Sequence, residues 1–315
     1  MHADRELASR QPLGEQLAGK SPARDALAGA HSASILRQSE RACRQLARRH
    51  YENFLVASIL LPRRLRQPFY NIYAFCRTAD DVADESGRPD LALQGLDRIA
   101  EGLDALFAGN PPADDFYPAL ADTVATFNLR QEPFFDLISA FRQDQTVTRY
   151  ATLEQLLDYC ARSANPVGRL VLQLADIRDA RRVELSDQIC TGLQLANFAQ
   201  DVGRDYSIGR VYLPSDWCQR HGVTTEMLSQ KTTPDGLRRL LREFCDFAES
   251  CFDRGMPLAD EVPKWLAADI KLFIHGGLET LAAVRRFDFD VLRKRPKVGP
   301  ITQGRLVLMA ILGRL

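Results

Sequence analysis

Apolar residues recur every three or four positions over most of the chain, and this spacing places them on one face of an α-helix. One such pattern runs from Leu93 to Leu106, between the breaker segments Gly87-Arg88-Pro89 and Asn110-Pro111-Pro112. The same spacing predicts further helices over residues 133–144, 152–174, 185–205, 234–254 and 263–287. Strand signals are nearly absent, because residues 210–214 form a short extended segment at most. The pattern therefore predicts an all-α, single-domain helical bundle.

Two of the predicted helical segments carry clusters of polar residues. Side chains three and four positions apart share one face of a helix, so each cluster forms a stripe. The first stripe consists of Tyr73, Arg77, Asp80, Asp81 and Asp84, and the second of Gln194, Asn197, Asp201 and Asp205. Two acidic stripes that face each other across an apolar interior repel strongly unless cations lie between them.

The cation that this pattern favours is Mg²⁺. Mg²⁺ takes oxygen ligands, usually keeps several waters, and binds one or two carboxylates together with substrate phosphate oxygens. Two such clusters therefore predict a diphosphate site with Mg²⁺ as cofactor. Bound metal ions neutralise the charge that develops as a diphosphate leaves carbon, so the expected chemistry is ionisation to a carbocation.

An acidic stripe on a helix is also compatible with a solvated surface. The flanking residues oppose that interpretation here, because Ile72 and Phe75 precede the first stripe while Leu195 and Phe198 lie within the second. A helix that is apolar on nearly all sides is buried, and buried carboxylates need partners. We therefore expect both stripes to line an internal site.

Composition narrows the class of protein. The 315 residues are 45% hydrophobic, which is enough for a large core, and equal numbers of basic and acidic residues, 41 each, give no basic excess for nucleic acid. The seven cysteines are scattered without a Cys-x-x-Cys pair, so we expect buried thiols in a reducing cytoplasm. No run of apolar residues approaches the length of a membrane span.

The two ends of the chain differ from the body. Residues 1–34 are rich in Ala, Gly and Ser and are predicted to form a flexible tail, which leaves 35–297 as the folded domain. Residues 298–315 mix arginines with leucines and isoleucines and form an amphipathic segment. This segment either lies peripherally on the inner membrane or packs back on the bundle, and the sequence leaves both open.

Short motifs give the chain a family resemblance. Over residues 35 to 295 it resembles the squalene/phytoene synthase family of class I isoprenoid synthase fold. The motifs are Leu60-Leu61-Pro62, Tyr73-Ala74-Phe75-Cys76-Arg77 with the first aspartates, Tyr159 with Val167-Gly168, the second cluster, and Gly209-Arg210-Val211-Tyr212-Leu213-Pro214. Residues 50–54, 163–169 and 193–198 are similar to the hopanoid-pathway branch, the hydroxysqualene synthases.

The resemblance implies a bundle around a central apolar cavity and a prenyl diphosphate substrate. The branch implies conversion of presqualene diphosphate to hydroxysqualene, in which water captures a rearranged cation and no nicotinamide cofactor takes part. A full squalene or phytoene synthase that condenses two prenyl diphosphates is the alternative. Companion enzymes of squalene or hopanoid biosynthesis are the implied partners.

Roles carry over residue by residue. The resemblance implies Mg²⁺ ligands at Asp80, Asp81, Asp84, Asn197, Asp201 and Asp205. It also implies that Arg77 and Arg210 hold the diphosphate, with Asn53 and Asn197 as further substrate contacts. Tyr73, Tyr159 and Tyr212 would hydrogen-bond the diphosphate or face the cation, or else pack in the core. Gln194 would orient the capturing water, or else satisfy a backbone group.

Departures from the family pattern bear on the branch. Many members carry a tyrosine of the second half-reaction near Gly277, where this chain has none, which disfavours reductive squalene synthesis. Two other classes are disfavoured as well. A di-iron bundle needs Glu-x-x-His pairs, and none of the five histidines has a glutamate three positions earlier. A non-catalytic assembly factor would be expected to lose aspartates, and both clusters are intact.

Overall fold

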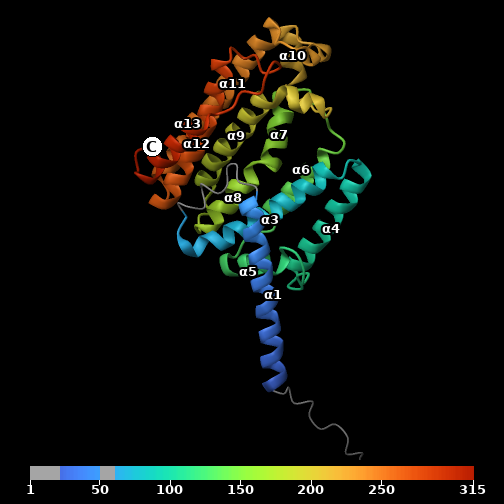
Figure 1. Cartoon of the computed structure of the whole chain (residues 1–315), viewed down its shortest axis with the longest axis vertical. Helices are drawn as coiled ribbons and strands as arrows, with labels where there is room; N and C mark the ends of the chain where they lie inside the picture. The colour runs from blue at the N-terminus through green and yellow to red at the C-terminus, as the bar shows by residue number, and fades with distance from the viewer. Residues whose placement is uncertain (1–21, 50–60) are drawn as a thin grey trace, which may run out of the picture.

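The computed structural model describes residues 22–49 and 61–315, and helices account for all the regular elements among them. Figure 1 shows how these helices are arranged. The elements are α1 (Pro22–Arg49), α3 (Arg63–Glu85), α4 (Pro89–Phe107), α5 (Tyr117–Phe127), α6 (Glu132–Gln143), α7 (Leu153–Ser163), α8 (Asn165–Leu174), α9 (Ala180–Ser207), α10 (Ser215–His221), η1 (Thr225–Ser229), α11 (Asp235–Gly255), η2 (Met256–Asp260), α12 (Lys264–Arg286) and α13 (Pro300–Ile311).

The predicted continuous helix over residues 152–174 is wrong. It is divided into α7 and α8 at Ala164, whose φ of −123° and ψ of −48° are not helical. The cause is Pro166, which has no N–H to continue the hydrogen-bond ladder but fits the first turn of a new helix. The break leaves Ser163 as the last residue of α7.

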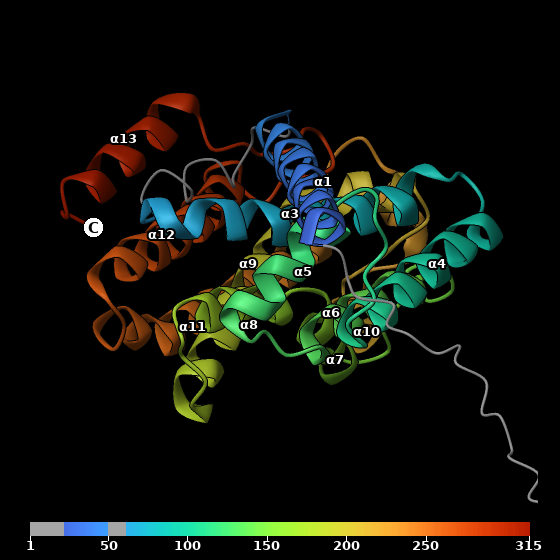
Figure 2. The same ribbon diagram turned by 90° about the horizontal axis from the view of Figure 1, so that it is seen from below.

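Helix α9 spans 28 residues and organises the packing. It begins one residue after Asp179, whose carboxylate caps the helix by accepting a hydrogen bond of 3.1 Å from the backbone N–H of Arg182. α9 packs against α7, α8, α11 and α12, while α3 packs against α1, α4, α5 and α6. In both ribbon views α12 and α13 lie on one side of the bundle and α4 on the other, with α3, α8 and α9 between them (Figures 1 and 2).

The hydrophobic core has two parts that meet near α8. One part surrounds α9 and α11 and includes Phe244 and Phe252, and the other surrounds α3 and α4 and includes Phe75 and Phe134. Gly168 on α8 allows a close approach to α9, because a Cβ there would lie 2.5 Å from Ser186 Oγ. The two acid-bearing helices, α3 and α9, are thus held on facing sides of one interior.

Helices α1 and α13 are the first and last elements that the structure describes. Helix α1 already begins at Pro22, within the segment expected to be a tail, and the residues before it lie outside the described part of the chain. Helix α13 packs on α12 through Leu306 and Ala310, while Ile301 and Leu308 on its other side are exposed. A membrane contact of this exposed side stays a prediction.

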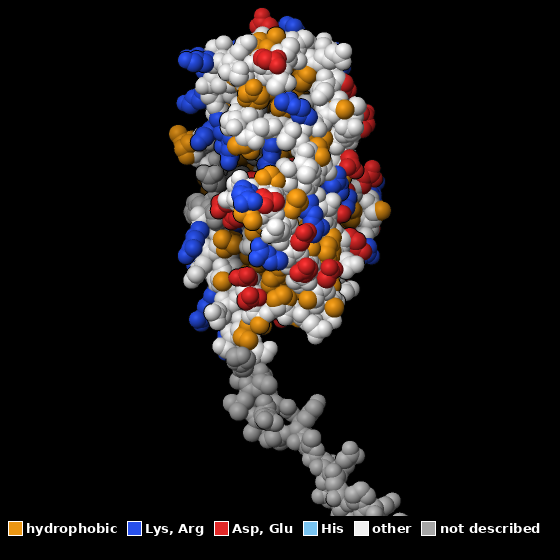
Figure 3. Space-filling view, turned by 90° about the vertical axis from the view of Figure 1, so that its right-hand side faces the viewer, with side chains coloured by type: hydrophobic (Ala, Val, Ile, Leu, Met, Phe, Trp, Pro, Cys, Tyr) orange, Lys and Arg blue, Asp and Glu red, His pale blue; other side chains and the backbone are white. Residues whose placement is uncertain are grey.

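The surface agrees with the balanced charge of the chain. On the face shown in Figure 3, basic and acidic side chains are interspersed and hydrophobic side chains appear only in small groups. Among the helices that the structure describes, none has the length and apolar character needed to cross a bilayer.

Candidate functional site

A polar pocket opens where α3, α6, α7 and α9 come together. Residues that are distant in the sequence converge on it, but Gln194 is the one member of the second stripe among its lining residues. Eight of the predicted site residues line this pocket, namely Tyr73, Arg77, Asp80, Asp84, Tyr159, Gln194, Arg210 and Tyr212.

On α3, one arginine holds two of the aspartates. Arg77 Nη1 lies 3.1 Å from Asp80 Oδ2, and Arg77 Nη2 contacts Asp81. These contacts follow directly from the helix, since Asp80 and Asp81 stand three and four positions after Arg77. The buried Nε of Arg77 has no hydrogen-bond partner among the described residues. The guanidinium therefore keeps a donor for a further anion.

A second arginine joins the two acidic clusters. The backbone N–H of Arg210 donates to the carbonyl of Asp205 at 2.8 Å, which fixes Arg210 just beyond the end of α9. Val211 then forms an isolated β-bridge with Arg149. The expected extended segment is therefore reduced to this single bridge. From this position Arg210 Nη2 reaches Asp84 Oδ1 on α3 at 3.0 Å.

The predicted metal ligands on α9 do not all lie at the polar pocket. Asp201 is 14% exposed and is bound by Arg295, whose Nη2 lies 3.0 Å from Asp201 Oδ2, in a neighbouring cavity. Asn197, one turn earlier, is exposed and does not line the polar pocket. Full burial of the carboxylates was also wrong for Asp80 and Asp84, whose side chains are 43% and 50% exposed, because the cluster borders an open pocket. Asn53 lies outside the described residues.

Two carboxyl groups of the site have raised pKa values. Burial, and then repulsion from Asp84, raises the pKa of Asp80 to about 6 despite the nearby Arg77. Burial and repulsion from Asp201 raise the pKa of Asp205 to about 7. Like charges that are held close together favour a counter-ion. Additional positive charge near these carboxylates would therefore stabilise their ionised forms.

Oxygen donors of this kind fit Mg²⁺. Among the described residues, no group of three His, Cys, Asp or Glu side chains is gathered closely enough to enclose a metal ion unaided. Mg²⁺ does not require such a cage, because it shares its coordination between one or two carboxylates, water and phosphate oxygens.

One acid of this pocket was not predicted from the sequence. Asp144 follows α6, and its Oδ2 accepts a hydrogen bond of 2.7 Å from the Tyr159 hydroxyl, while its buried Oδ1 has no partner among the described residues. Burial is the main reason that the pKa of Asp144 is raised to about 6. A single aspartate after a helix gives no stripe, so only the fold identifies it.

Aromatic rings form one wall of the pocket. Tyr212 stacks on Phe198 of α9 with 3.9 Å between ring centroids, and Tyr159 lies 5.8 Å from Tyr212. Both tyrosines are buried, which raises their pKa values and keeps the phenols neutral. Tyr159 and Tyr212 therefore combine core packing with exposure of part of each side chain to the pocket.

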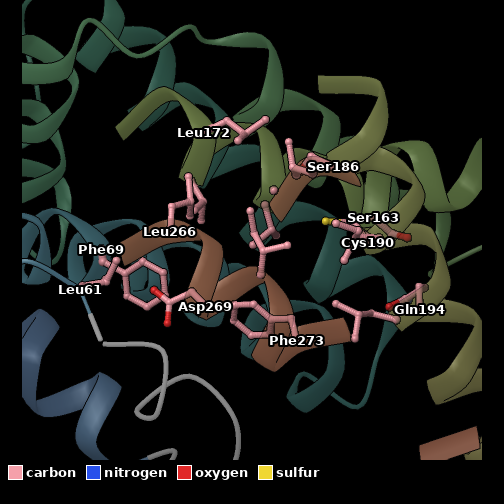
Figure 4. A pocket seen from close by; sticks show the side chains of 18 residues that line it. Leu61, Phe69, Ser163, Leu172, Ser186, Cys190, Gln194, Leu266, Asp269 and Phe273 are labelled. Carbon is pink, nitrogen blue, oxygen red and sulfur yellow. The ribbon is translucent and has the colours of Figure 1, made fainter. Parts of the chain in front are cut away.

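An apolar cavity of about 260 Å³ adjoins the polar pocket, between the two parts of the core. Figure 4 shows its wall, which is formed mainly by aliphatic and phenylalanine side chains. The cavity and the pocket share Ser163, Val167 and Gln194. An anionic group held by Arg77 and Arg210 can therefore carry a hydrocarbon chain that enters the cavity.

A family model for squalene/phytoene synthase matches residues 47–302. The chain belongs to this family. The crystal structure of squalene synthase HpnC from Alicyclobacillus acidocaldarius is similar, with a TM-score of 0.77 and 44% identity, covering 81% of this chain and 96% of that chain. The all-α isoprenoid synthase fold expected from the motifs is thereby confirmed.

Two relatives in the squalene/phytoene synthase family are named for different reactions. Hydroxysqualene synthase of Rhodopseudomonas palustris is 35% identical over 213 residues, covering 67% of this chain and 71% of the relative. A 15-cis-phytoene synthase of Synechococcus elongatus is 30% identical over 272 residues, covering 81% of this chain and 87% of the relative. The family therefore includes relatives named for both of the reactions weighed from the sequence.

Proposed function

We propose that this protein converts presqualene diphosphate to hydroxysqualene and diphosphate, with Mg²⁺ as cofactor. The observation that carries the proposal is the polar pocket with Arg77 and Arg210, which opens directly onto an apolar cavity. The likeness to the HpnC structure and to the R. palustris hydroxysqualene synthase supports the choice of this branch.

The reaction divides between the two spaces. Arg77 and Arg210 bind the diphosphate oxygens and orient the scissile bond, with Arg guanidinium groups suited to paired oxygens. When bound, Mg²⁺ supplies positive charge to the departing diphosphate, and Asp80, Asp84, Asp201 and Asp205 are the residues that would hold it. The bonding electrons leave with the diphosphate, and a carbocation remains at the mouth of the apolar cavity.

The cation then rearranges in a space that excludes bulk water. Tyr159 and Tyr212 offer ring faces and neutral hydroxyl groups on the pocket side. Gln194 borders both spaces, and we assign to its amide the orientation of the water that ends the reaction. The oxygen of that water forms the new C–O bond, and the proton that it loses passes to the released diphosphate.

Replacing Arg77 with lysine is expected to lower kcat/KM for the diphosphate substrate by about 10- to 100-fold, because lysine keeps the charge but loses the planar fork. Steady-state kinetics with presqualene diphosphate would measure the change. Arg98→Lys is the matched control, since Arg98 is an exposed arginine on α4 whose Nε donates to the Gln94 carbonyl of the same helix. Unchanged kcat/KM in Arg77→Lys would reduce Arg77 to a structural counter-ion of Asp80 and Asp81.

Isotope labelling tests the reaction itself. Purified protein with Mg²⁺ and presqualene diphosphate in H₂¹⁸O is expected to give an alcohol that carries one heavy oxygen, as read by mass spectrometry of the organic extract. Added NADPH is expected not to divert the product. NADPH-dependent squalene, or condensation of two farnesyl or geranylgeranyl diphosphates at a comparable rate, would replace this proposal with the full synthase.

A further inference from the structure

The hydroxyl group of Ser163 lies at the boundary between the two spaces of the site. Ser163 is the final residue of α7, and it lines both the polar pocket and the apolar cavity. Its Oγ is buried and has no hydrogen-bond partner among the described residues. A serine in the last turn of a helix often bonds back to an earlier carbonyl, so this hydroxyl stands out. Buried hydroxyls are normally satisfied by protein or by ordered water.

The reacting carbon has to lie at the same boundary. The diphosphate end of the substrate belongs with Arg77 and Arg210, and the hydrocarbon belongs in the apolar cavity. The bond that breaks therefore spans the region where the two spaces join. Ser163, Val167 and Gln194 are the residues common to both, and the valine side chain offers no hydrogen bond.

We propose that Ser163 is a positioning residue that holds, together with Gln194, the water molecule that captures the carbocation. This inference rests on the proposed function and adds a residue to it. A hydroxyl group and an amide provide the two polar partners that a buried water requires. In Figure 4, Ser163 and Gln194 are seen toward the same side of the cavity, away from Leu61 and Phe69.

The role of Ser163 predicts how the reaction ends. With the water in place, its oxygen donates an electron pair to the cationic carbon, one O–H bond breaks, and the proton passes to the released diphosphate. Without a held water, the cation instead loses a proton from a neighbouring carbon to the diphosphate and becomes a hydrocarbon. The ratio of alcohol to hydrocarbon therefore reports on Ser163, while the rate of diphosphate release reports on the earlier ionisation step.

The test compares Ser163→Val with Ser163→Thr in the full-length protein, with Mg²⁺ and presqualene diphosphate. The two replacements have nearly the same shape, but only threonine keeps a hydroxyl group. Valine is expected to lower the alcohol-to-hydrocarbon ratio about tenfold, the size of effect that one hydrogen bond supplies, with diphosphate release changed less than about twofold. Threonine is expected to retain most of the alcohol.

Two further variants complete the design. Ser163→Ala removes the hydroxyl without adding bulk, and it replaces the valine variant should valine disturb the break between α7 and α8. Ser250→Ala is the matched control, because the Ser250 hydroxyl donates to the Phe247 carbonyl at 2.7 Å on α11, away from both spaces. This control is expected to leave both the product ratio and the release rate unchanged.

The product ratios of these variants support or overturn the role of Ser163. An unchanged ratio in both Ser163→Val and Ser163→Ala, or equal loss of alcohol in the threonine variant, would overturn the role of Ser163 and leave the proposed function standing. A wild-type protein that releases diphosphate from presqualene diphosphate without forming alcohol would overturn both.

Discussion

Replacing Asp80 or Asp201 with asparagine is expected to lower turnover by at least about three orders of magnitude, because each change removes a charge that would hold Mg²⁺ against the departing diphosphate. The bundle is expected to stay folded. Burial and the neighbouring Asp84 already raise the pKa of Asp80 to about 6, so the ionised carboxylate is costly in the ligand-free protein. Asparagine removes that cost while keeping the shape of the side chain.

Kinetics and thermal unfolding separate these effects. Steady-state turnover of presqualene diphosphate measures the loss of activity. The wild-type protein is expected to melt at a higher temperature when Mg²⁺ and inorganic diphosphate are added together, and the variants are expected to lose this shift. Asp246→Asn is the matched control, since Asp246 is 62% exposed and pairs with Arg285 away from the site. Turnover near the wild-type level in both Asp80→Asn and Asp201→Asn would end the metal assignment.

Helical spacing in the sequence predicts the contacts that form within a single helix. The pairing of Arg77 with Asp80 and Asp81 requires only three- and four-residue steps along one helix. The helical character of the chain and the two stripes were therefore accessible without coordinates.

Contacts between segments that are distant in the sequence cannot be predicted from helical spacing. Arg295 reaches Asp201 from the segment after α12, and Asp144 meets Tyr159 from another helix end, so neither forms a local pattern. The break at Ala164 was missed because the apolar spacing continues across Pro166. That missed break is also what places Ser163 at the end of α7, at the boundary of the two spaces.

A second large effect is expected at Asp269, a carboxyl group on α12 that faces the apolar cavity. It is 3% exposed, and its Oδ1 has no hydrogen-bond partner among the described residues. Figure 4 shows it among apolar side chains near Phe69 and Phe273. Burial alone raises its pKa from an ordinary value of 3.8 to about 8. The group is therefore largely protonated at neutral pH, and ionising it inside the protein is unfavourable.

The pH dependence of stability follows from this raised pKa. An unfolded chain releases the Asp269 proton near pH 4, whereas the folded protein keeps it to about pH 8. The folded state thus binds more protons between these values, and the contribution of Asp269 to stability falls as the pH rises through this window. A tenfold change in proton affinity is worth about 1.4 kcal/mol, so the full loss is on the order of 5 kcal/mol by pH 8.

Asp269→Leu is therefore expected to raise the free energy of unfolding relative to wild type, with a gain that is small near pH 4 and grows to several kcal/mol near pH 8. The adjoining cavity accommodates the larger side chain. Denaturant unfolding at several pH values would measure the difference, in which the other acidic groups cancel because both proteins contain them. Asp246→Leu, at an exposed position, is expected to show no such trend. A difference that does not vary with pH would mean that Asp269 ionises normally in the folded protein.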